Sequence, residues 1–340
     1  MTKPLTSRRQ LLKGAAAGLT AASVAGACDA QVHHSEPAAS SGGSTAGGGS
    51  QPAGPSGIPR RNLGQSGLSV SILGFGGGVA FLDNPEPEWE LLLDEAVSSG
   101  ITYFDTAPVY YRDDDLHSEA RFGQVLAPHR ADIVLATKLS ARDPELAKSI
   151  FEESLVRLRT DHVDILYVHQ IRPEDNLEHL LDVMVPLAES YKAQGMARAI
   201  GISSMESPEL STEMIRRADL DVALFSFNAT YWQNFAATAM AEARAKDMGL
   251  IVMKVVNGLV KNGVTADELL GHAWSEPGVA CSLVGHTGLA HLRDNVSHAR
   301  SWGQSSFDAH RRREVESKVA HLAGPHALPW ARPGYTDGVV

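Results

Sequence analysis

Three polar side chains, Asp105, Lys138 and His169, each directly follow a short apolar run, and Tyr110 lies five residues beyond Asp105. A phenol has an ordinary pKa of about 10, which a neighbouring ammonium lowers because it favours the phenolate. We therefore expect Lys138 to prepare Tyr110 for proton donation, while Asp105 holds the ammonium through an ion pair. His169 is suited to orient a carbonyl oxygen by hydrogen bonding. Together, the four side chains predict proton transfer at a carbonyl oxygen.

None of these side chains supplies a hydride, so reduction at this site requires a nicotinamide cofactor. Each residue also has an ordinary explanation by itself: Lys138 as a solvated rim lysine, His169 as a satisfied histidine, and Asp105 as a turn cap. Tyr111 competes with Tyr110 for the role of proton donor. The chemical interpretation therefore depends on all four side chains meeting at one place.

Short apolar runs alternate with helical patterns beyond Ile58, which predicts eight strand-then-helix units. The predicted strands are 70–75, 101–104, 133–137, 163–168, 197–202, 222–227, 250–254 and 280–284. The helical patterns include 88–98, 144–159, 177–194, 208–218 and 235–247. Continuous apolar strands are typical of parallel sheets buried on both faces, so the units predict an α/β fold, a (β/α)8 TIM barrel. An N-terminal hairpin (61–68) and a C-terminal extension flank this barrel.

An open doubly wound sheet is the alternative, although Gly74–Gly78 departs from the GxGxxG spacing of that fold. In a barrel, chemistry collects where the carboxyl ends of the strands meet. The predicted strand ends bring polar or glycine residues to that rim: Gly76, Gly77, Asp105, Lys138, His169, Ser203, Ser204, Asn228, Lys254, Gly285, His286 and Thr287.

The bulk composition excludes several classes of protein. The chain has 340 residues, 43% of them hydrophobic, which is enough for one large barrel core. A net charge of −10 without a basic face argues against nucleic acid as a partner. The two cysteines, Cys28 and Cys281, are too few for a disulfide framework or a CxxC-based zinc site. We predict no metal site.

The first residues predict export rather than fold. Residues 1–27 contain Arg8-Arg9 followed by the weakly apolar run Gly14–Ala27, the anatomy of a twin-arginine signal peptide. That run is too short and too weakly apolar for a membrane span. The alternative is a disordered basic N-terminus that happens to contain two arginines. Export would place the protein in the periplasm or at the cell envelope, with the twin-arginine export machinery as a partner.

The segment 28–57 is rich in Gly, Ser, Ala and Pro, a composition that predicts a disordered linker ahead of the barrel at 58–340. Ala25-Gly26-Ala27 fits an ordinary signal peptidase site, and with Cys28 it also resembles a lipoprotein box. Lipidation of Cys28 would tether the protein to a membrane surface. Both forms of processing remain open.

The barrel region resembles the aldo-keto reductase family over nearly all of residues 60–300. The matching stretches, in chain order, are 61–71, 104–107 with Tyr110, 136–138, 154–158, 164–169 and 195–203. The resemblance implies a catalytic tetrad at Asp105, Tyr110, Lys138 and His169. It also implies NADP(H) bound in extended form across the barrel mouth, without a Rossmann fingerprint.

The resemblance also assigns cofactor contacts along the rim. Ser203 matches the serine that contacts the nicotinamide amide, Ser204 stands where the family often has Asn, and Asn228 replaces the usual Gln. His291 stands where an arginine often binds the 2′-phosphate; histidine is a weaker anion partner, so NAD(H) is an alternative to NADP(H). The remaining implied contacts are Gly76, Gly77, Asp105, Lys254, Gly285, His286, Thr287 and Asn295.

The sequence thus predicts an exported NADP(H)-dependent oxidoreductase that reduces aldehydes or ketones to alcohols, or the reverse, with Tyr110 as proton donor. Its substrate would be a small-molecule carbonyl or sugar. One alternative is a binding or regulatory barrel that retains the cofactor and turns over little. Another is a sugar isomerase or lyase that uses a bound nicotinamide.

Overall fold

The computed structural model describes residues 57–112, 116–260, 262–304 and 307–335. The predicted signal peptide, Cys28 and all of the predicted linker except Gly57 lie outside the described residues. Within the described ranges, no helix is long and apolar enough to cross a membrane.

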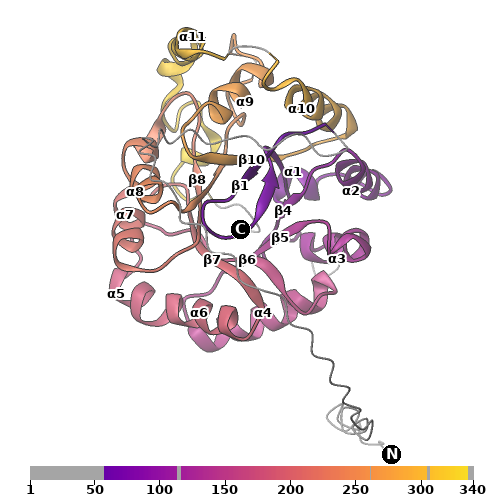
Figure 1. The fold of residues 1–340 in the computed structure, drawn as a ribbon, viewed down its shortest axis with the longest axis vertical. Coiled ribbons are helices and arrows are strands. Elements are labelled where there is room, and N and C mark those ends of the chain that lie inside the picture. The colour runs from indigo at the N-terminus through magenta and orange to yellow at the C-terminus, as the bar shows by residue number, and fades with distance from the viewer. Residues whose placement is uncertain (1–56, 113–115, 261, 305–306, 336–340) are drawn as a thin grey trace, which may run out of the picture. The chain divides into compact units, whose positions relative to one another are not determined.

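Eight parallel strands close into a barrel in which chain neighbours are also spatial neighbours. They are β3 (Leu73–Gly76), β4 (Tyr103–Asp105), β5 (Val134–Leu139), β6 (Val163–Val168), β7 (Ala197–Ser204), β8 (Val222–Ser226), β9 (Gly249–Met253) and β10 (Val279–Gly285). The last strand pairs with the first, from Ser282 opposite Leu73 to Gly285 opposite Gly76. The predicted (β/α)8 barrel is therefore confirmed, and an open doubly wound sheet is ruled out (Figure 1).

The N-terminal hairpin is present, but it takes residues that were predicted to begin the barrel. Strand β1 (Arg60–Asn62) pairs antiparallel with β2 (Ser69–Ser71), and the first barrel strand starts only at Leu73. The predicted strand 70–75 was therefore wrong in its first half. The physical reason is that Val70 and Leu68 turn into the barrel interior with the hairpin residue Leu63, where all three are buried. Arg61 donates to the carbonyl oxygens of Trp274 and Val279 (2.9 and 2.6 Å), so the hairpin lies at the amino ends of the strands.

Helices surround the strands in Figure 1. Those that cover the units are α2 (Glu88–Ser98), α3 (Ser118–Leu126), α4 (Pro144–Leu158), α6 (Val185–Ala193), α7 (Pro208–Arg217), α8 (Ala239–Ala245), α9 (Ala266–Trp274) and α10 (Leu289–Ser301). Helix α4 shows how local sequence sets the ends: Asp143 accepts from the Leu146 amide at its start, and Arg159 adopts a left-handed conformation at its end.

Two predicted helices are interrupted. The stretch 177–194 is divided into α5 (Leu177–His179), the π-helical turn η3 (Leu180–Met184) and α6. Pro186 in the first turn of α6 has no N–H to donate back into the preceding turn, which favours this local widening. The stretch 235–247 contains the end of a 3-10 turn, η4 (Trp232–Ala237), before α8 begins at Ala239.

The C-terminal extension follows the eighth unit and contains α11 (Ala309–Val319), η5 (Ala320–Leu322) and η6 (Pro329–Ala331). The short helix α1 (Val79–Leu82) lies near the other end of the chain, after β3. Trp330 is buried in the hydrophobic layer between sheet and helices, whereas Tyr335 lines a cavity beside Lys254. The extension therefore both packs on the barrel and reaches its mouth.

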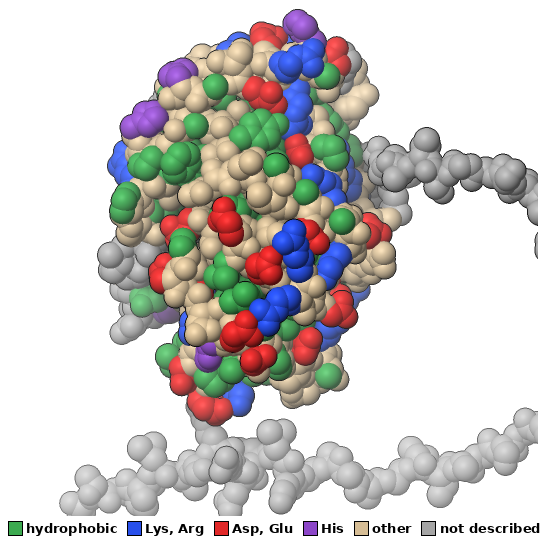
Figure 2. All heavy atoms as spheres, turned by 90° about the vertical axis from the view of Figure 1, so that its left-hand side faces the viewer, with side chains coloured by type: hydrophobic (Ala, Val, Ile, Leu, Met, Phe, Trp, Pro, Cys, Tyr) green, Lys and Arg blue, Asp and Glu red, His purple; other side chains and the backbone are tan. Residues whose placement is uncertain are grey.

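On the face shown in Figure 2, acidic and basic side chains are interspersed. Ion pairs link neighbouring helices: Arg216 of α7 contacts Glu242 of α8, and Arg217 contacts Glu178 of α5. Such exposed pairs contribute only about 0–1 kcal/mol each. Among the residues that the structure describes, this face thus shows no basic patch.

Candidate active site

A buried ion pair lies at the carboxyl ends of two adjacent strands. The Lys138 ammonium of β5 donates to Asp105 Oδ1 (2.5 Å) and to the backbone oxygen of Thr106 (2.6 Å). Both charged side chains are almost fully buried. A buried charge pair persists only when further hydrogen bonds satisfy its remaining donors and acceptors, and the Thr106 carbonyl supplies one of them. The short β4 ends at Asp105 and so places the carboxylate beside β5.

Tyr110 and His169 complete this cluster. The Lys138 Nζ atom lies 4.9 Å from the centre of the Tyr110 ring. The Tyr110 and His169 rings meet edge to face, with 6.1 Å between their centres. Tyr111, by contrast, stacks on His117 at 4.9 Å. The structure therefore brings together the four side chains predicted to act together, and it places Tyr110 rather than Tyr111 beside Lys138.

His169 is held in a neutral form. Burial, followed by the positive charges of Lys138, Arg142 and Arg172, lowers the pKa of His169 well below its ordinary value. A neutral imidazole carries one N–H, and the partner of one ring nitrogen decides where that proton lies. The His169 Nδ1 atom lies 2.9 Å from Ser140 Oγ. If the hydroxyl donates to Nδ1, Nε2 carries the proton and can donate to a substrate oxygen.

A cavity of about 480 Å³ opens beside this cluster. It is lined by residues from β3, β4, β9, β10, the segments that follow these strands and the C-terminal extension: Gly76–Ala80, Asp83, Asp105, Tyr110, Met253–Asn257, Leu283–Gly285, Thr287 and Tyr335. Its volume lies in the usual range for small-molecule sites. Two of the four predicted catalytic side chains, Asp105 and Tyr110, are part of its wall.

Glycines leave part of the wall of this cavity without side chains. A β-carbon on Gly78 would come within 4.0 Å of the Tyr110 ring, and one on Gly77 would meet Ser118 Oγ at 2.4 Å. A side chain at Gly77 would therefore clash with the packing behind the cavity, whereas a β-carbon at Gly78 would make only ordinary van der Waals contact with the tyrosine. The donor set is also suited to an anionic dinucleotide, because the Lys254 ammonium and the Thr287 hydroxyl line the same cavity. The residues present thus fit the nicotinamide cofactor that the sequence implies.

Lys254 follows β9 in a left-handed conformation (φ 62°) that few non-glycine residues adopt. Its ammonium donates to the Tyr335 hydroxyl at 3.1 Å and lies 4.9 Å from the centre of that ring. Asn228 donates to the backbone oxygen of Lys254 at 3.2 Å. The end of β8 and the C-terminal segment therefore both hold the loop that presents this cation.

Other predicted cofactor residues are engaged in internal hydrogen bonds. Ser203 Oγ accepts from the Gln170 amide (2.8 Å), and Ser204 Oγ donates to the Ile171 carbonyl (2.7 Å). Asn228 also accepts from the backbone N–H and the hydroxyl of Thr230. The structure thus places these three side chains among the strand ends but not in the wall of the cavity.

At the end of β10 and in the segment after it, some predicted cofactor residues line the cavity and others do not. Gly285 and Thr287 line the cavity. The His286 side chain is fully buried and stacks on Phe75 at 5.2 Å, outside the cavity. His291 Nδ1 contacts the Thr287 hydroxyl at 2.6 Å, and Asn295 is buried on α10. His286 was predicted as a cofactor contact, and its side chain lies outside the cavity.

Two residues next to the cluster were not predicted from the sequence. Tyr103 and Tyr167 are fully buried inside the barrel, and Tyr103 donates to Asp105 Oδ2 at 3.1 Å. They stand two positions before Asp105 and His169. Because alternate residues of a strand face the same side, that spacing was a signal that could have found them.

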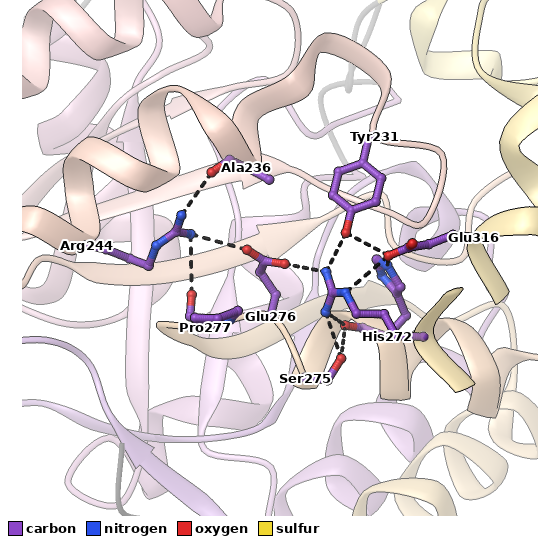
Figure 3. Close-up of polar contacts among 9 residues, drawn as sticks. Tyr231, Ala236, Arg244, His272, Ser275, Glu276, Pro277 and Glu316 are labelled. Atoms are coloured by element: carbon purple, nitrogen blue, oxygen red, sulfur yellow. Dashed lines mark hydrogen bonds and ion pairs between the residues drawn. The ribbon is translucent and has the colours of Figure 1, made fainter. Parts of the chain in front are cut away.

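A second cavity, of about 530 Å³, lies between η4 and the start of α11 and contains none of the predicted site residues. Beside it, Arg312 links Glu276, Glu316 and the Tyr231 hydroxyl. Figure 3 labels these three partners and draws the polar contacts around them as dashed lines. His272 Nε2 contacts the same Glu316 carboxylate at 3.1 Å. We call Tyr231, His272, Glu276, Arg312 and Glu316 the outer cluster.

No three of the His, Cys, Asp and Glu residues that the structure describes are grouped to hold a metal ion.

Comparison with known proteins shows which family the sequence of this chain resembles. The model of the aldo/keto reductase family matches residues 73–271, more than half of the chain. D-threo-aldose 1-dehydrogenase of a Pseudomonas species is 31% identical over 227 residues, 56% of this chain and 68% of that protein. L-galactose dehydrogenase of Arabidopsis thaliana is 33% identical over 160 residues, 44% of this chain and 49% of that protein. YqkF, an oxidoreductase of Bacillus subtilis, is 32% identical over 181 residues, 50% of this chain and 56% of its own length. The chain thus matches about half to two thirds of the length of these relatives.

Solved structures match over a longer range. A putative aldo-keto reductase of Pseudomonas aeruginosa, PA4992, is similar with a TM-score of 0.60 and 27% identity, covering 71% of this chain and 95% of that one. AKR11C1 of Bacillus halodurans gives a TM-score of 0.65 at 21% identity over 77% of this chain and 96% of that one. At that identity, the second likeness concerns the fold alone.

Proposed function

Because the chain belongs to the aldo/keto reductase family, we propose that it is an NAD(P)-dependent oxidoreductase that interconverts carbonyl compounds and alcohols. The observation that carries this proposal is the buried Lys138–Asp105 pair beneath the Tyr110 ring, in the wall of a cavity large enough for small molecules. A purely structural ion pair would not need a tyrosine and a neutral histidine beside it.

Each side chain has a distinct part in the proposed reaction. A bound nicotinamide supplies the hydride. Tyr110 donates its proton to the carbonyl oxygen as negative charge develops there, and the nearby Lys138 ammonium stabilises the phenolate left behind. Asp105 holds that ammonium in place. His169, which is neutral, donates a hydrogen bond from Nε2 to the same substrate oxygen when Ser140 donates to Nδ1.

The lining of the cavity supports a proposal for the residues that hold the cofactor. Lys254 supplies the positive charge for a phosphate group and Thr287 a hydroxyl donor, while glycines at 76–78 let the backbone approach closely. We propose NADP(H) as the cofactor, with His291 near the adenosine end in place of an arginine. Replacing His291 by Arg should therefore tighten NADPH binding and leave NADH binding unchanged. Equal affinity of the wild-type protein for the two cofactors would contradict the preference for NADP(H).

The two relatives named for sugar oxidation support a substrate class. D-threo-aldose 1-dehydrogenase and L-galactose dehydrogenase are each named for an aldose. We propose that this chain also acts on small polyhydroxylated carbonyl compounds. A panel of aldoses, aldehydes and ketones, followed by nicotinamide absorbance, tests both the reaction and the class.

The outcomes of that panel separate the alternatives. Oxidation of bound NADPH by at least one carbonyl, or reduction of NADP by at least one aldose, supports the proposal. No turnover with any compound favours a binding or regulatory barrel that retains its cofactor. Product formation without net consumption of nicotinamide favours an isomerase or lyase.

The N-terminal residues lead to a proposal about location. Arg8-Arg9 and the weakly apolar run after them support export by the twin-arginine route to the periplasm or cell envelope. Because that route carries folded proteins, the chain would travel with its cofactor bound. Cell fractionation of the full chain should find the Arg8→Lys, Arg9→Lys double variant in the cytoplasm. The Cys28→Ala variant should be exported but released from the membrane if Cys28 carries a lipid.

A further inference from the structure

Two buried tyrosines lie inside the barrel directly below the Asp105 carboxylate. Tyr103 of β4 and Tyr167 of β6 are both fully buried. Their hydroxyl oxygens are 3.1 Å apart, and the Tyr103 hydroxyl is 3.1 Å from Asp105 Oδ2. The opposite oxygen of the same carboxylate, Oδ1, accepts from Lys138. The two phenols thus form a short chain that ends on the carboxylate of the proposed site.

The direction of this chain follows from the number of protons. A phenol has one proton to donate. Burial, before any other cause, raises the pKa of Tyr103 and of Tyr167 well above the ordinary value, so both hydroxyls keep their protons. The Tyr103 hydroxyl donates its hydrogen bond to the carboxylate, which can only accept. Tyr167 must therefore donate to the Tyr103 oxygen, and the chain runs from Tyr167 through Tyr103 to Asp105.

The barrel makes room for these two rings. A β-carbon on Gly74 of β3 would lie 2.8 Å from a ring carbon of Tyr103 and 2.9 Å from Cys281 Sγ. A β-carbon on Gly201 of β7 would lie 3.2 Å from a ring carbon of Tyr167 and 2.1 Å from a backbone oxygen. Glycines on the two flanking strands thus leave the space that the rings fill. The aromatic pair is part of how the interior is built.

Packing alone does not account for the hydroxyl groups. Phenylalanine would fill nearly the same volume, and a buried hydroxyl costs free energy unless it is hydrogen-bonded. Here the hydroxyls bond to each other and to Asp105. A buried carboxylate paired with an ammonium also needs donors for its remaining lone pairs. Tyr103 supplies such a donor to the oxygen that faces away from Lys138.

We propose that Tyr103 and Tyr167 are positioning residues that hold Asp105 Oδ2, so that Oδ1 faces Lys138 beside Tyr110. The inference rests on the proposed function, because its effect on turnover passes through Lys138 and Tyr110. Besides Asp105, the titratable group that acts on both phenols is Cys281 of β10, and Arg61 of the hairpin acts in turn on Cys281. Burial keeps the Cys281 thiol protonated by raising its pKa.

Removing the Tyr103 hydroxyl has a predictable electrostatic result. Without that donor, the negative charge of Asp105 is drawn less toward Oδ2 and offsets the Lys138 ammonium more fully. The ammonium then stabilises the Tyr110 phenolate less. We expect Tyr103→Phe to lower kcat by about 10- to 100-fold, the size of a lost hydrogen bond to a charged group, with KM and cofactor affinity within about twofold. The alkaline limb of the pH–kcat profile should move to higher pH.

Tyr191→Phe is the matched control, because Tyr191 is also buried but packs on Phe151 outside the barrel. It removes the same oxygen and should leave kcat and its pH profile unchanged. Tyr167→Phe removes only the far hydroxyl and should have a smaller effect than Tyr103→Phe. In the Tyr103→Phe background, Tyr167→Phe should have no further effect, because the two act through one chain.

An ionisation measurement separates this inference from the proposed function. The absorbance difference between each protein and its Tyr110→Phe derivative reports ionisation of Tyr110 without any turnover. Its midpoint should move to higher pH in Tyr103→Phe, or in Tyr167→Phe if the first variant does not fold, and stay unchanged in Tyr191→Phe. An unchanged midpoint in a folded Tyr103→Phe or Tyr167→Phe variant overturns the positioning role. A shifted midpoint supports it, even where the wild-type protein turns over no carbonyl compound.

Discussion

The candidate active site and the outer cluster contain nearly the same types of side chain. The site has a carboxylate, a lysine, a tyrosine and a histidine; the outer cluster has two carboxylates, an arginine, a tyrosine and a histidine. They differ in what surrounds the tyrosine. Tyr231 donates to Glu316 at 2.8 Å and accepts from Arg312 at 2.6 Å, so its hydroxyl is fully used in joining α11 to the loop after β8. Tyr110 instead lies over the Lys138 ammonium, although both tyrosines line a cavity.

The electrostatic settings differ accordingly. Burial, reinforced by the Glu316 carboxylate and opposed by Arg312, raises the pKa of Tyr231 to about 12. That phenol keeps its proton throughout the physiological range. The comparison indicates that residue types alone do not make a site for proton transfer. Both tyrosines line a cavity, so the charged groups that contact each phenol decide it. Matched substitutions in the two regions test this difference.

The largest expected effect separates the two tyrosines. Tyr110→Phe should lower kcat by about 10²- to 10⁴-fold, the usual contribution of a positioned proton donor, with cofactor affinity nearly unchanged. Tyr231→Phe should keep full turnover. Steady-state kinetics on a confirmed substrate, with fluorescence titration of NADPH, measure both. Wild-type activity in Tyr110→Phe would mean that another group donates the proton.

The next effect concerns the cations. Lys138→Met should lower the free energy of unfolding by about 3–5 kcal/mol, because it leaves Asp105 charged and buried without its ammonium. Arg312→Met should cost about 1–3 kcal/mol, since Glu276 keeps Arg244 and Glu316 keeps His272. Urea unfolding followed by circular dichroism gives both values. Equal losses of unfolding free energy in the two variants would show that burial does not make the Lys138–Asp105 pair more costly to break than the contacts of Arg312.

A smaller effect depends on pH. Burial lowers the pKa of His272 to about 4, against about 6.5 in an unfolded chain. Above pH 6.5, roughly the unfolded pKa, His272 is neutral in both the folded and the unfolded chain. Below it the unfolded chain binds the proton first, so the free energy of unfolding falls as the pH drops from about 6.5 toward 4. His272→Phe should reduce this slope in unfolding experiments without changing kcat. The exposed His310 provides the control: the slope in His310→Gln should equal that of the wild type.

The smallest effect distinguishes two serines. Ser140→Ala removes the partner of His169 Nδ1 and should lower kcat by about 3- to 10-fold, corresponding to roughly 1 kcal/mol for one hydrogen bond. Ser275→Ala removes an acceptor of Arg312 in the outer cluster and should leave kcat unchanged. Kinetics of the two variants at matched pH test this. A similar loss in both would point to a general effect on folding rather than to the orientation of His169.

Much of the fold could be predicted because its signals are local. The strand 163–168 coincides with β6, since a short stretch rich in β-branched and aromatic residues is typical of a buried strand. The predicted strand 70–75 failed because pairing with β1, a tertiary event, takes its first residues. The prediction of one uninterrupted helix over 177–194 was wrong, because Pro186 alters the hydrogen bonding in the middle of this stretch.

The site was predictable to a similar degree. Strand ends brought Asp105, Lys138 and His169 to one rim because parallel strands in a barrel share one carboxyl end. The directions of Ser203, Ser204 and His286 could not be predicted, because each depends on partners that are distant in the chain, such as Gln170, Ile171 and Phe75. The same applies to Trp330 and Tyr335, which the fold sends to different places.

The order of strands and helices, the residue types at each strand end and the alternation that turns Tyr103 and Asp105 to one side are properties of the sequence alone. Those patterns depend on neighbours one to four positions apart, where backbone geometry leaves little choice. Only the tertiary structure decided which tyrosine faces an ammonium and which is bound between an arginine and a carboxylate. That decision depends on closure of the barrel and docking of α11, which bring together charges far apart in the chain; their distances and burial set the electrostatic energies.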